Sequence, residues 1–408
     1  MTSTLLDSPK SMQTHLGFRG LIVFIAVMNM FIPLSIDLYL PALPAMGDYF
    51  QATPAVVNLT LVSFFFFFAI GILLFGPLSD KYGRKPILLT GLLIYSIASG
   101  LCAISDTIHQ LILFRIVQAL GAGSIIAVSL ALVKDCFEGK TRDFVLALVQ
   151  GMSVIAPMVA PILGAFILQF ASWRETFWLL AILGILNLMA GILFQETLPV
   201  KDRYQGSISG SLARLLVVSK NVGFTAILII FSLFMAPYMA YVAISSYVYI
   251  SYFHLSAQSY SYFFAANSLF AILGPVAYLR LIHKITPKKF TQGCFAIALI
   301  SGLCLLAAGA YSPWVFLIAF LPFTLVESAI RPLSTSILLD QQKTDTGSAS
   351  SLINAVNTIF GSIGMLLGTM NWSNIVEGLG ILITATAVLA IIVWFALTKS
   401  KITVTGLS

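Results

Sequence analysis

Apolar runs alternate with short polar turns along almost the whole chain. Each run is long enough to cross a bilayer as a helix, which needs about 20 residues. The runs lack the period-2 alternation of a membrane β-barrel, and only helices or closed barrels satisfy their backbone groups in hydrocarbon. The pattern therefore predicts twelve membrane-spanning helices. Their expected ranges are 19–42, 54–78, 86–104, 108–133, 144–170, 174–195, 222–248, 257–281, 289–310, 314–339, 347–369 and 377–398.

The longest polar segment divides these helices into two sets of six. It runs over 196–220, and its Gly and Ser content is typical of a linker. We therefore predict an amino-terminal half at 1–195, a cytoplasmic linker at 196–220 and a carboxyl-terminal half at 221–408. Gly274-Pro275 closes the eighth expected helix as Gly76-Pro77 closes the second, which suggests a parallel repeat of two halves.

Composition agrees with an all-α, polytopic membrane protein. Of 408 residues, 59% are hydrophobic and only 9% are charged, and the mean hydropathy is +0.98. This leaves too little polar surface for a water-soluble globule. The first apolar run continues to Leu40 without a small-residue cleavage site, so we expect a retained helix and not a signal peptide.

The distribution of cations predicts the orientation in the membrane. Placing both termini and every loop that follows an even-numbered helix in the cytoplasm gathers 19 of the 22 Lys and Arg residues there, as the positive-inside rule requires. Of the others, Arg174 lies in an opposite loop, and Arg115 and Arg331 fall within expected helices. The net charge of +7 is thus explained by topology, and binding to nucleic acid is not expected.

Motifs for enzymatic chemistry are absent from the sequence. The four Cys and four His residues show no CxxC, HExxH or other ligand spacing, and neither a P-loop nor a nucleophile with a matching base is present. We therefore expect no metal, no cofactor and no enzymatic activity. A channel is left as an alternative that unitary currents would reveal.

A basic segment from Gly76 to Pro86 separates two uncharged runs. It resembles the loop signature of the major facilitator superfamily, Gly-x-Leu-x-Asp-x-x-Gly-Arg-[Arg/Lys]. The matching residues are Gly76, Leu78, Asp80, Gly83, Arg84 and Lys85. Further motifs of the first half are Ser35 to Pro44, Arg115-x-x-Gln118-Ala119-x-Gly121, Ala156-Pro157-x-x-Ala160-Pro161-x-Leu163-Gly164, Trp173-Arg174 and Glu196-Thr197-Leu198-Pro199. Together they resemble the Bcr/CflA group of drug exporters.

This resemblance implies a major facilitator fold of two six-helix halves around a central cavity. It further implies a monomeric multidrug efflux antiporter in the bacterial inner membrane, which exchanges small amphipathic compounds of the bicyclomycin or chloramphenicol type for protons and confers antibiotic resistance. An exporter of an endogenous metallophore, amino acid or sugar on the same fold is the alternative.

Two ionisable residues, Asp37 and Arg115, stand out within the expected helices of the first half. Asp37 has no Lys or Arg within 15 residues, so its carboxylate must face water, form an ion pair or bind a proton. Arg115 needs a partner, and the resemblance ties it to proton coupling, so we expect Arg115 and Gln118 to act with the Asp37 region. The structural alternatives are anchoring by Asp37 at a wet helix end, pinning of a helix by Arg115 and a helix–helix hydrogen bond by Gln118.

Other positions carry weaker expectations. Asp80 and Arg84, close to Gly76 and Gly83, are expected to latch one arrangement of the halves, Asp80 by bonding to amides at a helix amino terminus and Arg84 by bonding to carbonyls, with topology alone as the alternative. Pro157, Pro161 and Gly164 are expected to kink a helix and allow close packing, for the antiporter motif or for packing only. Glu327 and Arg331, at i and i+4, are expected to form an internal salt bridge, with a second titrating or ligand-binding acid as the alternative. Further candidates for a substrate cavity are Tyr39, Tyr238, Tyr241, Asn267, Asn354 and Asn357.

Overall fold

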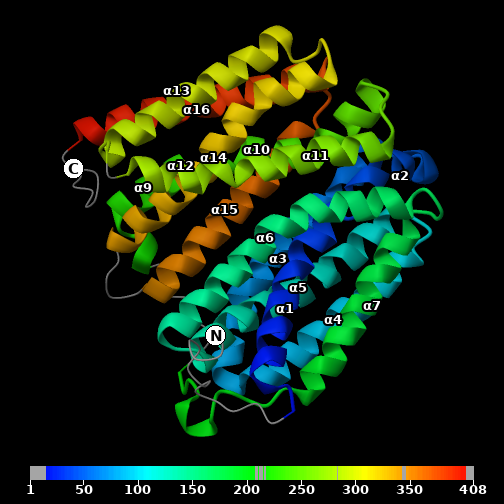
Figure 1. Cartoon of the computed structure of the whole chain (residues 1–408), viewed down its shortest axis with the longest axis vertical. Coiled ribbons are helices and arrows are strands. Elements are labelled where there is room, and N and C mark those ends of the chain that lie inside the picture. The colour runs from blue at the N-terminus through cyan, green and yellow to red at the C-terminus, as the bar shows by residue number, and fades with distance from the viewer. Residues whose placement is uncertain are drawn as a thin grey trace, which may run out of the picture. The chain divides into compact units, whose positions relative to one another are not determined.

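The computed structural model describes residues 15–206, 210, 215, 217–282, 284–341 and 346–400. Every regular element in these residues is helical, and 11 helices are long and apolar enough to cross a membrane. An additional helix, α6 (Gly139–Ile167), contains a shorter apolar stretch at Ile155–Ile167. The predicted all-α membrane fold is confirmed (Figure 1).

By its contacts, the chain divides into two compact units. The first contains Met1–Ala42 and Phe66–Ser211, and the second contains Leu43–Phe65 and Leu212–Ser408. The helix α3 (Pro54–Tyr82) contributes to both. The predicted halves and linker at 196–220 remain a prediction, and part of that linker lies outside the described residues.

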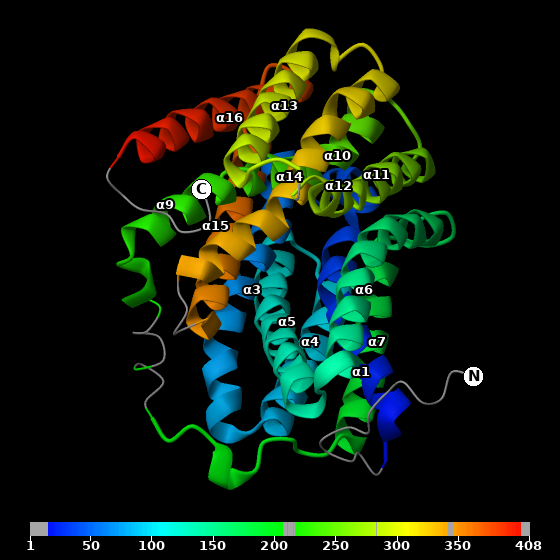
Figure 2. The ribbon, with the colours of Figure 1, turned by 60° about the vertical axis from the view of Figure 1, so that its left-hand side comes forward.

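Helices of the first unit pack through small residues. α4 contacts α5 and α7, and α1 contacts α6 and α5, and these helices run side by side in Figure 2. A Cβ atom on Gly164 of α6 would overlap the backbone carbonyl of Leu38, so glycine is needed for the close approach of these segments. The bounds are α1 (Gly17–Asp37), η1 (Leu40–Ala42), α4 (Arg84–Ala103), α5 (Ile108–Cys136), α6, α7 (Arg174–Leu193) and η2 (Val200–Asp202).

In the second unit, α13 lies beside α16 and α14, while α10 packs on α15 and α12 packs on α14 (Figure 1). Stacked rings of Phe234, Phe295 and Phe323 fill part of its interior. The bounds are α2 (Leu43–Phe50), α9 (Val222–Ser232), α10 (Met235–Ser246), η3 (Tyr247–Tyr252), α11 (Ala257–Ala271), α12 (Leu273–Leu281), α13 (Pro287–Ala308), α14 (Pro313–Gln341), α15 (Thr346–Gly368) and α16 (Ile375–Lys399).

Three predicted helices are interrupted. The first, expected over 19–42, ends at Asp37 and continues as a 3-10 turn and α2, because Pro41 and Pro44 disfavour α-helical geometry before them. The seventh, expected over 222–248, consists of α9, α10 and the π-helix η3. The eighth is interrupted at Ile272, just before Gly274-Pro275.

The expected basic turn between the second and third helices is much shorter than its motif. α3 continues through Pro77 to Tyr82, and α4 begins at Arg84. The whole break is Gly83, whose φ of 105° is open to glycine and disfavoured for residues with a side chain. The Asp80 and Arg84 side chains are therefore held on two rigid helix ends and not on a loose loop.

Candidate functional site

The carboxylate of Asp37 ends α1 in a buried position. The residue is 5% exposed, and it makes no hydrogen bond or ion pair with any residue that the structure describes. The preceding turn is fixed by Ser35, whose hydroxyl donates to the carbonyl of Phe31 at 2.5 Å and shares a 2.5 Å hydrogen bond with the hydroxyl of Tyr95. Asp37 is thus an acid on a well-ordered helix end without a compensating cation.

Arg115 lies at the centre of a buried polar network in the first unit. Its exposed fraction is 0%, and its Nη1 donates to Oε1 of Gln118 at 2.5 Å. Gln118 in turn donates from Nε2 to the hydroxyl of Ser99 at 2.7 Å. The guanidinium also lies 4.8 Å from the ring centroid of Tyr39 and 5.7 Å from that of Phe177, which allows cation–π attraction.

The structure brings Arg115 and Gln118 together as expected from their spacing, but it does not pair Arg115 with Asp37. Tyr39, two residues after Asp37, packs on the guanidinium, so the chain segment that ends α1 lies against Arg115. Tyr39 is itself fully buried. A small shift of this segment could therefore change the distance between the acid and the cation.

At the α3–α4 junction, Arg84 joins two helix ends. Its Nε donates to Oδ2 of Asp135 at 2.9 Å, and its Nη1 donates to the hydroxyl of Ser79 at 2.8 Å and to Oδ1 of Asp80. Asp135 belongs to the last turn of α5. The partners of Arg84 are carboxylates and a hydroxyl, whereas the sequence suggested backbone carbonyls.

The amino-terminal amides of α4 are bound by Glu196, not by Asp80. The Glu196 carboxylate accepts hydrogen bonds from the backbone N–H groups of Arg84 at 3.0 Å and Lys85 at 3.1 Å. It also accepts from Thr197 and Leu198, and Arg203 lies 3.8 Å away. A carboxylate here complements the positive end of the α4 dipole.

Sequence reasoning missed Asp135 and Glu196 as site residues. The signal for Glu196 was present, because it opens the Glu-Thr-Leu-Pro motif at the end of the sixth expected helix. Asp135 directly follows Lys134 beyond the expected end of the fourth helix, where a surface charge is unremarkable without tertiary information.

Pro157 and Pro161 lie inside α6, each removing a helical hydrogen bond. Gly164 follows them on the same helix, where it meets the carbonyl of Leu38 just after Asp37. The motif of α6 therefore packs directly on the segment that carries the buried acid.

In the second unit, Glu327 and Arg331 form the expected i,i+4 ion pair. Both Nε and Nη2 of Arg331 lie 2.7 Å from Oε1 of Glu327. Arg331 also approaches α10, with Nη2 3.6 Å from the sulfur of Met235 and its guanidinium 5.6 Å from the ring centroid of Tyr238.

The remaining cavity candidates are scattered through the second unit. Tyr241 is fully buried between stacked rings, including that of Phe320 at 4.2 Å. Asn267 accepts a hydrogen bond from Thr324 at 2.7 Å, and Asn357 accepts one from Ser232 at 2.7 Å. Asn354 is exposed. Asn267 on α11 and Asn357 on α15 therefore tie helices together as well as offering polar groups.

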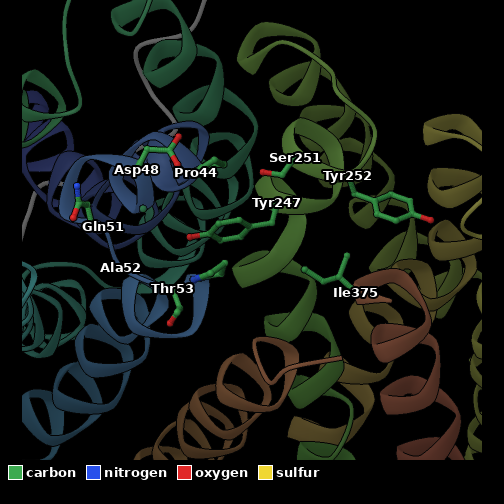
Figure 3. Close-up of a pocket in the computed structure, with 11 residues that line it drawn as sticks. Pro44, Asp48, Gln51, Ala52, Thr53, Tyr247, Ser251, Tyr252 and Ile375 are labelled. Atoms are coloured by element: carbon green, nitrogen blue, oxygen red, sulfur yellow. The ribbon is translucent and has the colours of Figure 1, made fainter. Parts of the chain in front are cut away.

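A pocket of about 830 Å³ in the second unit was not predicted from the sequence (Figure 3). Its volume is within the usual range for small-molecule sites, about 300 to 1,000 Å³. Figure 3 shows Tyr247 extending from η3 toward the segment around Pro44 and Ala52, and its hydroxyl donates to the carbonyl of Leu43 at 3.5 Å. Asp48 is the one carboxylate in its lining.

Within the described residues, His, Cys, Asp and Glu form no group of three or more that could hold a metal ion. The free cysteines Cys102, Cys136 and Cys294 are buried, and Cys304 is exposed.

Comparison with known proteins decides the family. A family model of the Major Facilitator Superfamily matches residues 21–365. The chain belongs to this superfamily. The protein is therefore a multi-pass membrane transporter, as the sequence predicted.

Curated relatives include bacterial drug-resistance proteins. The chain is 29% identical over 403 residues to the "Uncharacterized MFS-type transporter YdgK" of Bacillus subtilis (strain 168), covering 98% of this chain and 99% of that protein. It is 25% identical over 355 residues to the "Bicyclomycin resistance protein homolog" of Haemophilus influenzae, covering 86% and 89%. It is 33% identical over 168 residues to "Multidrug resistance protein MdtL" of Escherichia coli O81, covering 41% and 43%. The resemblance to the Bcr/CflA group is thus confirmed.

Solved structures agree on the fold. The human organic anion transporter MFSD10 has a TM-score of 0.69 at 17% identity and covers 93% of this chain and 99% of its own. A D-xylose-proton symporter has a TM-score of 0.70 at 15% identity, with 91% and 97% covered. The predicted major facilitator fold is confirmed by this match.

Proposed function

We propose that the protein is a proton-coupled multidrug efflux transporter that exports small amphipathic compounds in exchange for protons. It works as a monomer in the bacterial inner membrane with both termini in the cytoplasm, and two six-helix halves alternate access to the substrate. The relatives named for bicyclomycin and multidrug resistance support export of drugs over export of an endogenous solute.

The observation that carries the proton assignment is the solitary burial of Asp37. An unpaired carboxylate inside a membrane-spanning segment is costly, by about 2.5 to 3.5 kcal/mol on insertion scales. Binding a proton removes that charge, and releasing it requires water or a nearby cation. Arg115 is the cation that packs on the same segment through Tyr39.

Coupling needs only that substrate and proton prefer different states of the transporter. Protonation of Asp37 from the periplasmic side would favour release of substrate, and loss of the proton toward the cytoplasm would restore affinity. A ligand can shift such an equilibrium by no more than its differential affinity for the two states. Gln118 keeps the Arg115 guanidinium oriented through this cycle, and Pro157, Pro161 and Gly164 supply the deformable helix against which the Asp37 segment moves.

The Arg84 cluster is proposed as the conformational latch. Arg84 connects α4 with Asp80 of α3 and Asp135 of α5, and Glu196 fixes the start of α4 to the segment after α7. Breaking this cluster during the transport cycle would release the ends of α3, α4 and α5 in one step. Gly76 and Gly83 are proposed to give the backbone the freedom that this requires.

Uptake into everted membrane vesicles tests the proposal. Vesicles with the wild-type protein should accumulate radiolabelled chloramphenicol or bicyclomycin when respiration acidifies their interior, and a protonophore should abolish the accumulation. Asp37→Asn, which keeps the shape and loses the titratable proton, should abolish gradient-driven uptake. Asp202→Asn, an exposed acid of η2, is the matched control and should transport normally.

Gradient-driven uptake by Asp37→Asn at the wild-type rate would refute the role of Asp37. Wild-type vesicles that accumulate none of a panel of such drugs, but do accumulate an endogenous solute, would refute drug export and favour the alternative cargo.

A further inference from the structure

Arg115 and Arg331 both lie away from the ends of their membrane-spanning helices, and they differ in access. Arg115 is completely buried under the rings of Tyr39 and Phe177. The side chain of Arg331 is 53% exposed. A ligand could therefore reach the guanidinium of Arg331 without any rearrangement of its neighbours.

The two partners of the Arg331 ion pair differ in exposure. The Glu327 side chain is 5% exposed, and its Oε1 receives both Nε and Nη2 of Arg331. The carboxylate thus lies inside the second unit and the guanidinium reaches outward from it. Although the pair is neutral as a whole, its accessible end is the cation.

One nitrogen of this guanidinium is left for a ligand. Nε and Nη2 are engaged by Glu327, and Nη2 also contacts the sulfur of Met235, whereas Nη1 has no hydrogen-bond partner among the residues that the structure describes. The ring of Tyr238 lies beside the group, with its centroid 5.6 Å away. Charged donors flanked by an aromatic ring and a thioether suit an acceptor group on an apolar body.

Depth in the membrane makes the exposure informative. Arg331 precedes the last residue of α14, Gln341, by ten positions, which is about 15 Å along a helix. A permanently charged side chain at such a depth avoids lipid and faces water or a polar ligand. A salt bridge that served only to neutralise two charges would not need to leave half of the arginine side chain accessible.

We propose that this transporter also carries amphipathic organic anions, and that Arg331 binds their anionic oxygen group, such as a carboxylate, with Glu327 fixing the orientation of the guanidinium and Met235 and Tyr238 contacting the apolar part. The inference rests on the proposed function, because it adds a class of exported compound, amphipathic molecules with an anionic group, to uncharged drugs such as chloramphenicol. A protonated amine would meet a like charge at this position, so organic cations are disfavoured there.

A matched pair of ligands tests this assignment by binding alone. Dansylglycine carries a carboxylate beside an aromatic body, and its methyl ester lacks the charge. Both are titrated by fluorescence against the purified full-length protein in detergent. The test variant is the double substitution Glu327→Gln with Arg331→Gln, which removes both charges and leaves no unpaired buried ion.

In the double variant, we expect dansylglycine to bind about 10-fold to 100-fold more weakly, as for loss of a charge-assisted hydrogen bond, and the ester to change by about twofold at most. Arg331→Lys should retain part of the affinity for the acid, because it keeps the charge and loses the planar fork. Arg280→Gln, which removes an exposed arginine at the end of α12, should change neither ligand.

Equal weakening of acid and ester in the double variant would overturn the proposal, because it would indicate a structural role. Unchanged binding of the acid in that variant, or a wild-type protein that does not bind the acid, would overturn it as well. Failure of the proposed function has a different signature: the Asp37→Asn vesicles keep their gradient-driven uptake while the purified protein still selects the acid through Arg331.

Discussion

Removing the Glu196 carboxylate should loosen the start of α4. The substitution Glu196→Ala deletes an acceptor for two backbone amides of the first turn, those of Arg84 and Lys85, at 3.0 and 3.1 Å. It also frees the N–H groups of Thr197 and Leu198, which bind the same carboxylate.

The magnitude follows from these contacts. Loss of a side-chain cap costs about 0.5 to 2 kcal/mol, and loss of a negative charge at a helix amino terminus costs about 0.3 to 1 kcal/mol. The Glu196 side chain is 26% exposed, so water and salt screen part of the electrostatic share. We therefore expect a local loss of about 1 to 2 kcal/mol, which is a factor of about 5 to 30 in the population of the opened state.

Hydrogen–deuterium exchange of the purified protein measures this directly. The peptide that contains Arg84 and Lys85 should exchange about 5-fold to 30-fold faster in Glu196→Ala, and Glu196→Gln should give a smaller increase because its amide oxygen still accepts. Glu377→Ala is the matched control, since Glu377 is an exposed acid in the first turn of α16. Unchanged exchange at Arg84 and Lys85 in Glu196→Ala would refute the assigned capping role, as would an equal increase in the Glu377 variant.

Two further substitutions test the helix ends and the helix packing. Arg84→Lys keeps the charge that sets topology but cannot reach Asp135, Ser79 and Asp80 together, so we expect normal orientation by terminal reporter fusions and slower drug uptake into vesicles. The reverse change, Lys81→Arg, is the control, and normal uptake by Arg84→Lys would leave only a topological role for Arg84. Gly164→Ala forces a Cβ onto the Leu38 carbonyl and should lower the free energy of unfolding by about 1 to 3 kcal/mol, seen as a lower melting temperature of the purified protein. Gly151→Ala on the same helix meets open space and should be neutral or slightly stabilising. Equal melting temperatures of the two variants would contradict the close contact of Gly164.

Helix positions were largely predictable because length and hydropathy alone define them. The fourth helix, expected over 108–133, is observed at Ile108–Cys136, and its start is fixed by a local capping box of Thr107 and Gln110. Interruptions were harder to predict. The break between α9 and α10 falls within an apolar run whose composition does not change there, so hydropathy carries no signal for it.

Candidate residues were predictable where their partners are local in sequence. The spacings of Arg115 with Gln118 and of Glu327 with Arg331 place each pair on one helix face, and both contacts are observed. The partners Asp135 and Glu196 of the Arg84 region lie 51 and 112 residues away and follow only from tertiary packing. The sequence also did not show which face of a helix is buried. A helix that is apolar on every side does not reveal that Tyr241 is fully buried between rings.

The repeated Gly-Pro pairs show that the two halves stabilise equivalent helix ends by different physics. A Cβ at Gly274 would collide with Ser328 and with the carbonyl of Leu325, so this glycine serves close packing of α12 on α14. A Cβ at Gly76 meets nothing within 4 Å, and the helix end that follows is held instead by the Arg84 cluster. Arg280, at the equivalent end of α12, makes no ion pair with a described residue. An ionic cluster can open and close as its partners change, whereas a packed glycine contact gains nothing from such a change, and this difference supports our proposal of a latch in the first half.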